Sequence, residues 1–404
     1  MEKDIEQLSN NQQSRKIRVA FFADILTKDF DGAIKTMYQL INRIPSDKFE
    51  YMFFCGVPPT HSFYHKIVKV PAVTIPVNAS YKISLPSLAK IKLQNTLSEF
   101  NPDVIHISTP SLLGFWGLKY AKENSIPVLS IYHTHYISYV PYYFKWIPCL
   151  IKPFENLAIK LSRKFYNKCN IVYVPTPIII QELVGYGIDE KLLKQWHRGL
   201  DLNTFNPERA DKNYIRNITG NDKPCLLYAS RIVWEKNVET LFEIYDEVIA
   251  QGIDVNFIVA GSGVAEPDAR KRMPIAHFLG YLSHEELGKL YASTDIFIFP
   301  SISESYGNVV AEATACGCIP VIARGGGSQA LVKDGETGFL CEPNNAKDYV
   351  SKIKLLLNNS DLQQKMQDEA RKYVELFRWE NLTNEYFNDI AMLAQLRNHE
   401  TGQK

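Results

Sequence analysis

The sequence has no long apolar run, and this absence limits where the protein can reside. No stretch of about 18 apolar residues is free of charged residues, so the sequence predicts no membrane-spanning helix. The opening stretch, MEKDIEQLSNNQQSRK, has no apolar core of the kind a secretion signal requires. We therefore expect a flexible tail over residues 1–16 and a cytoplasmic protein.

Cysteine is scarce and scattered, which excludes two further classes. Of the seven cysteines only Cys316 and Cys318 are close together, and no histidine accompanies them at the spacing of a zinc site. The pattern favours small buried thiols over a disulfide framework or a zinc site. A full Gly-x-Gly-x-x-Gly fingerprint followed by an acidic residue is also absent, so an NAD-binding oxidoreductase is disfavoured.

Short apolar runs alternate with helical patterns along the whole chain. Two successive series of this kind predict an α/β fold with two doubly wound Rossmann-like domains facing a cleft. The predicted strands are Arg18–Ala23, Val104–Ile107, Val128–Tyr132, Ile171–Val174, Leu226–Ala229, Asn256–Ala260, Ile296–Phe299 and Pro320–Ala323. Helices are predicted around Met37–Ile44 and over Glu239–Ile249, Val309–Cys316 and Trp379–Leu396.

The length of 404 residues also favours two domains. We expect domains over 17–200 and 201–380, with a boundary in the polar stretch 201–224, and a terminal helix over 381–404 that can return to the first domain. Residues 1–200 carry 24 Lys/Arg against 15 Asp/Glu, whereas the remainder carries 21 against 29. A basic half and an acidic half indicate different partners for each.

Two carboxylates and two cations stand at predicted junctions between strand and helix. Glu304 follows the strand IFIFP and Glu312 lies in the helix that comes next. The free amides at the start of that helix suit a phosphate or sugar oxygen. Arg231 and Lys236 follow the strand LLYAS, and two cations there suit a diphosphate. A plain crossover with solvated surface charges remains an alternative for each pair, and the Gly-x-Gly of VAGSG is weak by itself.

Together these segments resemble the family 4 glycosyltransferases of the GT-B fold. The resemblance runs from about residue 17 to 397 and rests on SRIVWEK, VAGSG, HFLGYL, FPSISESYGNVVAEATACG and the run from GGG to DGETGFL. IYHTHY, WHRGLD followed by FNP, and SYGNVVAEA are most similar to bacterial and plastid lipid glycosyltransferases, such as phosphatidylinositol and glycolipid mannosyltransferases and sulfoquinovosyldiacylglycerol synthase.

The resemblance implies a role for individual positions. Arg231 and Lys236 would bind the donor diphosphate, Glu304 would hold sugar hydroxyls, and Glu312 would accept hydrogen bonds from the ribose. His133 would reach the transferred sugar from the first, acceptor-side domain, so the expected catalytic residues are His133, Glu304, Arg231 and Lys236. The other positions expected to bind the donor are Gly32, Gly261, Gly263, Phe278, Leu279, Gly280, Ser305, Tyr306, Gly307, Asn308 and Val309.

The chain departs from the family pattern at two positions. Asp31 precedes Gly32 where the family usually has Gly or Asn, and Asn237 follows Lys236 where Gly is frequent. Asp29-Phe30-Asp31 also spells the metal-binding signature of the other major glycosyltransferase fold. Because Arg231 and Lys236 already supply positive charge, we interpret that signature as coincidence and expect neither a metal nor a cofactor. Two more histidines, His106 and His135, could line the cleft or belong to the core.

The resemblance implies a retaining transfer of a hexose from a UDP- or GDP-linked sugar to an acceptor hydroxyl. No carboxylate is an obvious covalent nucleophile, which fits a front-face mechanism. A soluble or polysaccharide acceptor, or a nucleotide-sugar epimerase of the same fold, remains the alternative.

The basic half indicates where such an acceptor would be met. Residues 58–98 contain five lysines and no acidic residue, and residues 142–168 mix aromatic side chains with cations. This composition favours peripheral binding to an anionic membrane on the inner face of the cell and a lipid acceptor. Aromatics packed inside and a solvated basic face are the alternative. No nucleic-acid motif is present, so we expect no nucleic-acid partner.

Overall fold

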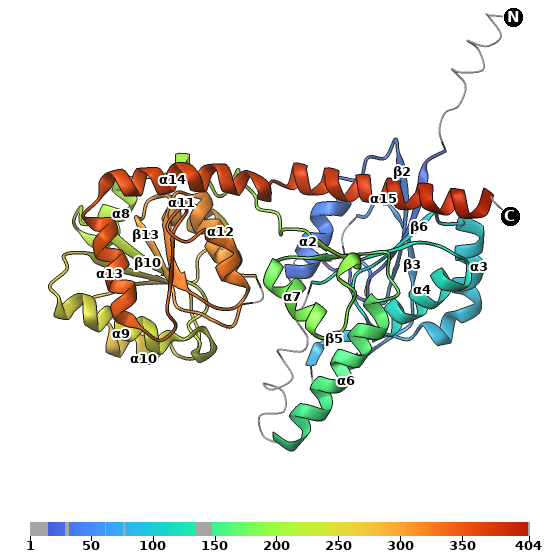
Figure 1. Ribbon diagram of the computed structural model, residues 1–404, viewed down its shortest axis with the longest axis horizontal. Coiled ribbons are helices and arrows are strands. Elements are labelled where there is room, and N and C mark those ends of the chain that lie inside the picture. The colour runs from blue at the N-terminus through green and yellow to red at the C-terminus, as the bar shows by residue number, and fades with distance from the viewer. Residues whose placement is uncertain are drawn as a thin grey trace, which may run out of the picture. The chain divides into compact units, whose positions relative to one another are not determined.

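The computed structural model describes residues 15–28, 32–60, 62–75, 78–133, 148–304 and 306–402. The described chain divides into two compact units (Figure 1). The first consists of the described residues up to Val174 together with Glu182–Gln195 and the residues from Thr383 on. The second consists of Pro175–Gln181 and Trp196–Leu382.

The first unit is built on a seven-stranded parallel sheet with the order β3-β2-β1-β6-β7-β8-β9. Its central strands are short apolar runs whose residues are buried, as expected for strands covered by helices on both faces. The strands are β1 (Ile17–Phe22), β2 (Phe49–Cys55), β3 (Lys66–Lys69), β6 (Val104–Ile107), β7 (Val128–Ile131), β8 (Ile171–Val174) and β9 (Leu193–Gln195). Its described helices include α2 (Gly32–Ile41), α3 (Lys90–Phe100), α4 (Leu112–Glu123) and α6 (Pro148–Tyr166). Helix α7 (Pro177–Gly185) is divided between the units, with its residues up to Gln181 in the second and those from Glu182 in the first. A separate antiparallel pair joins β4 (Ala72–Ile75) to β5 (Asn78–Ser84).

The second unit has a six-stranded parallel sheet with the order β12-β11-β10-β13-β14-β15. The strands are β10 (Cys225–Ala229), β11 (Asn256–Ala260), β12 (His277–Gly280), β13 (Ile296–Phe299), β14 (Ile319–Ala323) and β15 (Phe339–Cys341). The helices are α8 (Lys212–Thr219), α9 (Val238–Ala250), α10 (Glu266–Arg272), α11 (His284–Ala292), α12 (Asn308–Ala315), α13 (Ala346–Leu357) and α14 (Ser360–Val374). Two parallel sheets with crossover helices confirm the predicted α/β fold of two doubly wound domains.

The polar stretch 201–224 belongs to the second unit, whose long segment begins at Trp196. It contains α8, which the low apolar content of the stretch does not reveal. The Asp211 carboxylate accepts hydrogen bonds from the amides of Asn213 (2.9 Å) and Tyr214 (3.1 Å), so it caps the start of the helix. Gly220 ends it in the left-handed conformation, and Ile215 is the residue that it buries.

The last helix, α15 (Trp379–Gly402), completes the first unit from Thr383 on. Figure 1 shows it lying across the strands of the first sheet. Its Tyr386 hydroxyl lies 2.7 Å from Nδ1 of His106 on β6 and 3.3 Å from the hydroxyl of Tyr51 on β2. These buried contacts fix the helix against two strands that are far from it in sequence.

A second polar cluster on α15 reaches the other half of the same sheet. The Asp389 carboxylate accepts a hydrogen bond from the Tyr173 hydroxyl on β8 and pairs with Lys194 Nζ on β9 at 2.6 Å. The Lys194 ammonium also lies 3.0 Å from a carboxylate oxygen of Glu385. The helix is therefore part of the first domain rather than an appendage.

The cysteines are buried thiols, as the sequence predicts, with one exception. All seven cysteines are free thiols, and six are buried, but Cys149 on α6 is exposed. Burial raises the pKa of the Cys316 and Cys318 thiols, so this close pair stays protonated at neutral pH. Within the described residues no helix combines the length and the apolar character needed to cross a bilayer.

Candidate active site

Lys236 and Glu304 form an ion pair in the second unit, although 68 residues separate them in the sequence. Lys236 ends a short 3₁₀ turn after β10, and Glu304 lies in the loop after β13. The side chains are only 11% and 17% exposed, so the pair is largely shielded from water. The Ser301 hydroxyl, fully buried, also donates to the Glu304 carboxylate at 3.4 Å. Both loops follow adjacent parallel strands, where ligands of such sheets bind.

The loop that carries Glu304 is fixed by the glycine run after β14. Gly326 has a φ of +59°, and a Cβ there would lie 2.6 Å from the carbonyl oxygen of Ile302 and 2.9 Å from that of Glu304. Gly327 donates its amide to the Glu304 carbonyl at 2.5 Å. A side chain at position 326 would therefore push the Glu304 loop out of place.

Asn237 holds the Lys236 turn in register with that loop. Its φ of +56° is in the left-handed region, which explains why glycine is frequent at this position in the family that the sequence resembles. The asparagine adds contacts that glycine cannot make. Its side-chain amide donates to the carbonyl of Pro300 at 3.2 Å and to the side chain of Asn344 at 2.9 Å. The Thr240 hydroxyl donates back to the Asn237 side chain at 3.2 Å.

Sequence reasoning missed this bracing. The sequence marks Asn237 only as a departure from glycine, and it gives no signal for Ser301 or Asn344. An Asn at a position where related chains have Gly indicates a residue with left-handed backbone conformation. This substitution is the signal from which the role of Asn237 in fixing the turn could have been predicted.

Arg231 follows β10 by two residues, and its side chain is exposed. Its carbonyl accepts a hydrogen bond from the buried Tyr228 hydroxyl at 3.1 Å. Among the residues that the structure describes, its guanidinium makes no ion pair. The group is thus placed at the same sheet edge as Lys236 with its charge turned to solvent.

Gly261 and Gly263 allow two loops to pack backbone against backbone. A Cβ at Gly261 would collide with the carbonyl oxygen of Ser230, and one at Gly263 with the carbonyl oxygen of Ile232. The Ile232 amide donates to the Ser262 carbonyl at 3.0 Å, which ties the loops together. These glycines therefore have a structural reason to be present, since they fix the turn that carries Arg231.

Phe278, Leu279 and Gly280 lie at the half-buried end of β12, the edge strand of the second sheet. The Gly280 carbonyl accepts a hydrogen bond from the Gly261 amide at 2.6 Å. The guanidinium of Arg270 covers the Phe278 ring at 4.6 Å from its centroid, so the ring itself is occupied. A ligand here would meet the backbone rather than that ring.

Most of the remaining residues that are predicted to bind the sugar donor lie at the start of α12. Gly307 precedes the helix with a φ of +89°, and a Cβ there would lie 2.7 Å from that of Ser328. Asn308 is exposed and Val309 half-buried, whereas the Tyr306 side chain is buried and its hydroxyl accepts the Arg198 amide at 3.3 Å. Only the backbone of Tyr306 can thus serve a ligand. Glu312 is 9% exposed, one turn into the helix, and Ser305 lies outside the described residues.

His133 lies in the first unit, two residues beyond the end of β7, and is buried. Its neighbour His106 is a core residue, since it is fully buried, packs on Phe21 at 4.1 Å and contacts Tyr386. Burial, and secondarily the His133 ring, lower the pKa of His106 well below its usual value. Gly32 begins α2. His135 and the sequence Asp29–Asp31 lie outside the described residues.

No metal centre emerges from the described part of the chain, where no group of three His, Cys, Asp or Glu side chains is placed to share an ion. The arrangement of the second unit instead offers cations and amides at one sheet edge. Such an edge can bind an anionic ligand through Lys236, Arg231 and the start of α12.

Comparison with known proteins identifies the family. A model described as glycosyltransferase family 4 matches residues 30–204, and one described as glycosyl transferases group 1 matches residues 211–373. A sulfoquinovosyl transferase of Arabidopsis thaliana is 32% identical over 83% of this chain, which spans only 64% of that protein's length. A GDP-mannose-dependent alpha-mannosyltransferase of Mycolicibacterium smegmatis is 26% identical over 81% of this chain and 84% of the relative.

Two further matches agree with this assignment. The alpha-monoglucosyldiacylglycerol synthase of Acholeplasma laidlawii is 24% identical over 81% of this chain and 85% of the relative. The crystal structure of Anabaena HepE in complex with UDP superposes with a TM-score of 0.70 at 17% identity, over 93% of this chain and 100% of that one. The chain therefore combines a glycosyltransferase family 4 domain with a glycosyl transferases group 1 domain, and it has the two parallel-sheet domains of the GT-B fold.

Proposed function

We propose that the chain transfers a hexose from a UDP- or GDP-linked sugar to an acceptor hydroxyl with retention of configuration. The observation that carries this proposal is the shielded Lys236–Glu304 pair at the sheet edge where Arg231 and the start of α12 also lie. A mannosyltransferase relative uses GDP-mannose, and a protein of the same fold binds UDP. Both facts support a nucleotide-sugar donor without choosing between the two bases.

Each group has a distinct part in the proposed reaction. An ammonium has three N–H donors, so Lys236 can keep its contact with Glu304 while it binds a phosphate oxygen of the donor. The Glu304 carboxylate accepts hydrogen bonds from sugar hydroxyls. As the bond between the sugar and the diphosphate breaks, negative charge grows on the leaving oxygen, and Lys236 and Arg231 stabilise it most at that point.

The acceptor oxygen would attack from the face that the diphosphate leaves. A new C–O bond forms at the anomeric carbon while the old one breaks, and its electron pair stays on the diphosphate. The leaving phosphate oxygen takes the acceptor proton, so no protein base is needed. The protein contributes orientation and charge stabilisation, and we assign His133 the part of contacting the transferred sugar.

We propose a membrane lipid as the acceptor and the inner face of an anionic membrane as the place of reaction. A relative makes a monoglucosyldiacylglycerol, which supports a lipid acceptor. On α6, the side chains of Phe154, Leu157 and Leu161 are 40%, 48% and 43% exposed and recur at helical spacing. Exposed cations lie on the same helix and just after it, namely Lys152, Lys160, Arg163 and Lys164 on α6 and Lys168 two residues beyond its end. Aromatic and aliphatic residues beside cations suit the headgroup region of a bilayer.

A donor panel tests the core of the proposal. Purified protein is incubated with UDP- and GDP-sugars, and release of the nucleoside diphosphate is followed with and without vesicles that contain candidate lipids. We expect release from one donor class, a faster rate with lipid, and the same rates in excess EDTA. Interconversion of the sugar without transfer would identify an epimerase, and loss of activity in EDTA that magnesium or manganese restores would refute metal independence.

A further inference from the structure

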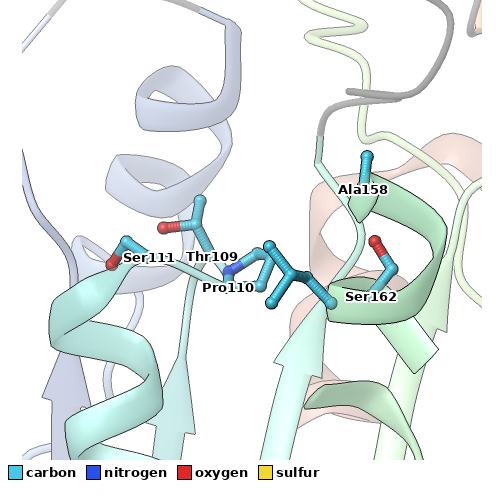
Figure 2. A pocket seen from close by; sticks show the side chains of 6 residues that line it. Thr109, Pro110, Ser111, Ala158 and Ser162 are labelled. Carbon is cyan, nitrogen blue, oxygen red and sulfur yellow. The ribbon is translucent and has the colours of Figure 1, made fainter. Parts of the chain in front are cut away.

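A pocket at the edge of the first sheet adjoins the apolar face of α6. Its volume is about 260 Å³, and it is lined by Thr109, Pro110, Ser111, Ala158, Leu161 and Ser162. Figure 2 shows Thr109, Pro110 and Ser111 on the segment that leads into α4, with Ala158 and Ser162 on α6 across from them. The loop follows the carboxyl end of β6, beside the strand whose end leads to His133.

The lining combines apolar walls with hydroxyl groups. Most of the lining is hydrocarbon, and Thr109, Ser111 and Ser162 add a small polar part. The Ser111 hydroxyl also accepts a hydrogen bond from the Gly114 amide at 3.1 Å. A sugar would gain little from such walls, whereas the part of a lipid where a hydrocarbon chain joins its ester would bury apolar surface there. The mixture matches the glycerol-ester segment of a lipid, where two ester groups adjoin hydrocarbon chains.

Leu161 connects the pocket to the proposed membrane face. It lines the pocket and is also 43% exposed on the row that Phe154 and Leu157 begin. A lipid chain that leaves the bilayer along Phe154, Leu157 and Leu161 would therefore contact apolar side chains all the way to the pocket. The pocket is smaller than the 300–1,000 Å³ typical of a site for a whole ligand, so it fits a segment of a lipid rather than all of it.

The same pair of helices carries positive charge farther along. A second hollow between α4 and α6 is lined by Lys119, Lys122, Lys164 and Lys168, together with Phe115, Leu118 and Glu123. Lys119 lies 3.7 Å from Glu123, so three of the four lysines there are not paired with the one acidic residue. These lysines would attract the surface formed by α4 and α6 to an anionic membrane.

We infer that the pocket binds the glycerol-ester segment of the acceptor lipid and so lifts its headgroup hydroxyl out of the bilayer toward the end of β7. The inference rests on the proposed lipid acceptor and adds to it the place where the lipid is held. It also explains why a lipid with a glycerol-ester segment would be preferred over its free headgroup.

Filling the pocket tests the inference. Ala158→Trp places a large side chain in the pocket, and Asn156→Trp adds the same bulk at an exposed position of α6 that does not line it. Acceptors are diacylglycerol, phosphatidylinositol and a monoglycosyl diacylglycerol in vesicles of phosphatidylglycerol and phosphatidylcholine. We expect Ala158→Trp to lose at least about tenfold in kcat/KM for the lipid that the wild type uses, because a blocked pocket costs this much in discrimination. Asn156→Trp should keep wild-type values, and both variants should sediment with vesicles and release nucleotide from the donor alone as the wild type does.

A diacylglycerol with a photoreactive diazirine close to its ester provides a readout independent of turnover. In the wild type and in Asn156→Trp it should label peptides that contain Thr109–Ser111 or Ala158–Ser162, and in Ala158→Trp this label should disappear. Equal transfer by the two tryptophan variants, or labelling elsewhere, would overturn the pocket while leaving the lipid acceptor intact. A wild type that releases nucleotide but glycosylates no lipid of the panel would instead overturn the proposed acceptor and the pocket together.

Discussion

At the scale of single residues, Lys236 has to satisfy two partners. In the structure its ammonium neutralises Glu304, and in the proposed reaction it also meets a diphosphate. A carboxylate next to the cation keeps the lysine in position before the donor arrives. Removal of the cation would leave the Glu304 carboxylate charged and unpaired in a site that is largely shielded from water, which is unfavourable.

We predict that Lys236→Met lowers kcat by about 100-fold, close to 3 kcal/mol, because the lost contact acts most strongly on the charge of the leaving group. Lys271→Met, on the exposed side of α10, is the matched control. The double variant Lys236→Met with Glu304→Gln should be more stable than Lys236→Met alone, since it removes the unpaired carboxylate. Thermal melting and steady-state kinetics check both points, and a Lys236→Met enzyme with near-normal turnover would exclude the assigned role.

Substitutions at Asn237 distinguish the effect of its backbone conformation from that of its side-chain hydrogen bonds. Asn237→Gly keeps the left-handed conformation but removes the hydrogen bonds to Pro300 and Asn344. We expect it to fold normally and to lose several-fold in kcat, because the Lys236 turn is no longer tied to the end of β13. Asn237→Ala adds a backbone cost of roughly 1–2 kcal/mol and should also melt earlier.

Asn344→Gly is the control for this prediction, since it removes one of the same hydrogen bonds without changing the backbone at position 237 and keeps the left-handed conformation of position 344, whose φ is +57°. It should share the kinetic defect of Asn237→Gly in part. If Asn237→Gly works at the wild-type rate, the bracing does not position Lys236.

His106 makes stability depend on pH. Burial lowers the pKa of this core histidine in the folded protein. Below its usual pKa of about 6.5 the unfolded chain binds a proton that the folded chain does not, so stability falls as pH decreases. Between pH 7 and pH 5 the slope from this residue should approach about 1.4 kcal/mol per pH unit. Denaturant unfolding at several pH values should show a shallower slope for His106→Gln, and an unchanged slope would contradict the assignment.

At the scale of helices and strands, the bounds of an element could be predicted mainly where it contains a continuous apolar run. β6, β8 and β11 have the predicted bounds because each is a continuous buried run. β2 was missed, although it is almost wholly buried, because Glu50 interrupts its apolar run. The predicted helix near Ile44 ends at Ile41, before Pro45, since the residue preceding proline disfavours the helical conformation.

The candidate site was predicted less completely for a physical reason. Strand ends and residue types indicated that Lys236 and Glu304 belong to one sheet edge, but their direct contact depends on loop geometry. That geometry is set by Gly326 and Asn237 through backbone and side-chain contacts between distant segments. No periodicity in the sequence encodes such contacts.

The charged face of α6 gives a prediction at the same scale. Reversal of Lys160, Arg163, Lys164 and Lys168 to Glu should abolish sedimentation with anionic vesicles, since each cation contributes about 1 kcal/mol near such a surface. Donor hydrolysis without lipid should be unchanged. A matched control reverses four exposed lysines of the second unit, Lys212, Lys271, Lys347 and Lys365. Binding of the wild type to anionic vesicles that does not weaken with salt would contradict the electrostatic reading.

At the scale of the whole molecule, the first domain is discontinuous in sequence, because α15 returns to it after the second domain. We predict that a chain ending at Leu382 loses the stability of the first domain alone. It lacks Tyr386 and Asp389, whose removal leaves the buried polar groups of His106 and Tyr173 without these partners. Hydrogen exchange should show faster exchange in β2, β6 and β8 and wild-type protection in β10 and β11. Uniform protection in both domains would show that α15 is dispensable.

The return of α15 also bears on how the protein is made. A ribosome extends a chain at roughly 5–20 residues per second, and all of the second domain except Pro175–Gln181 is translated between Gln195 and Thr383. The first domain must then wait on the order of ten seconds or more for the helix that covers its sheet. During that interval the first half of the chain emerges with an apolar sheet face uncovered, while the second domain, whose last residue is Leu382, can fold as it appears. Translation speed and chaperone supply should therefore affect the yield of this protein through its first domain, the half that is synthesised earliest and finished last.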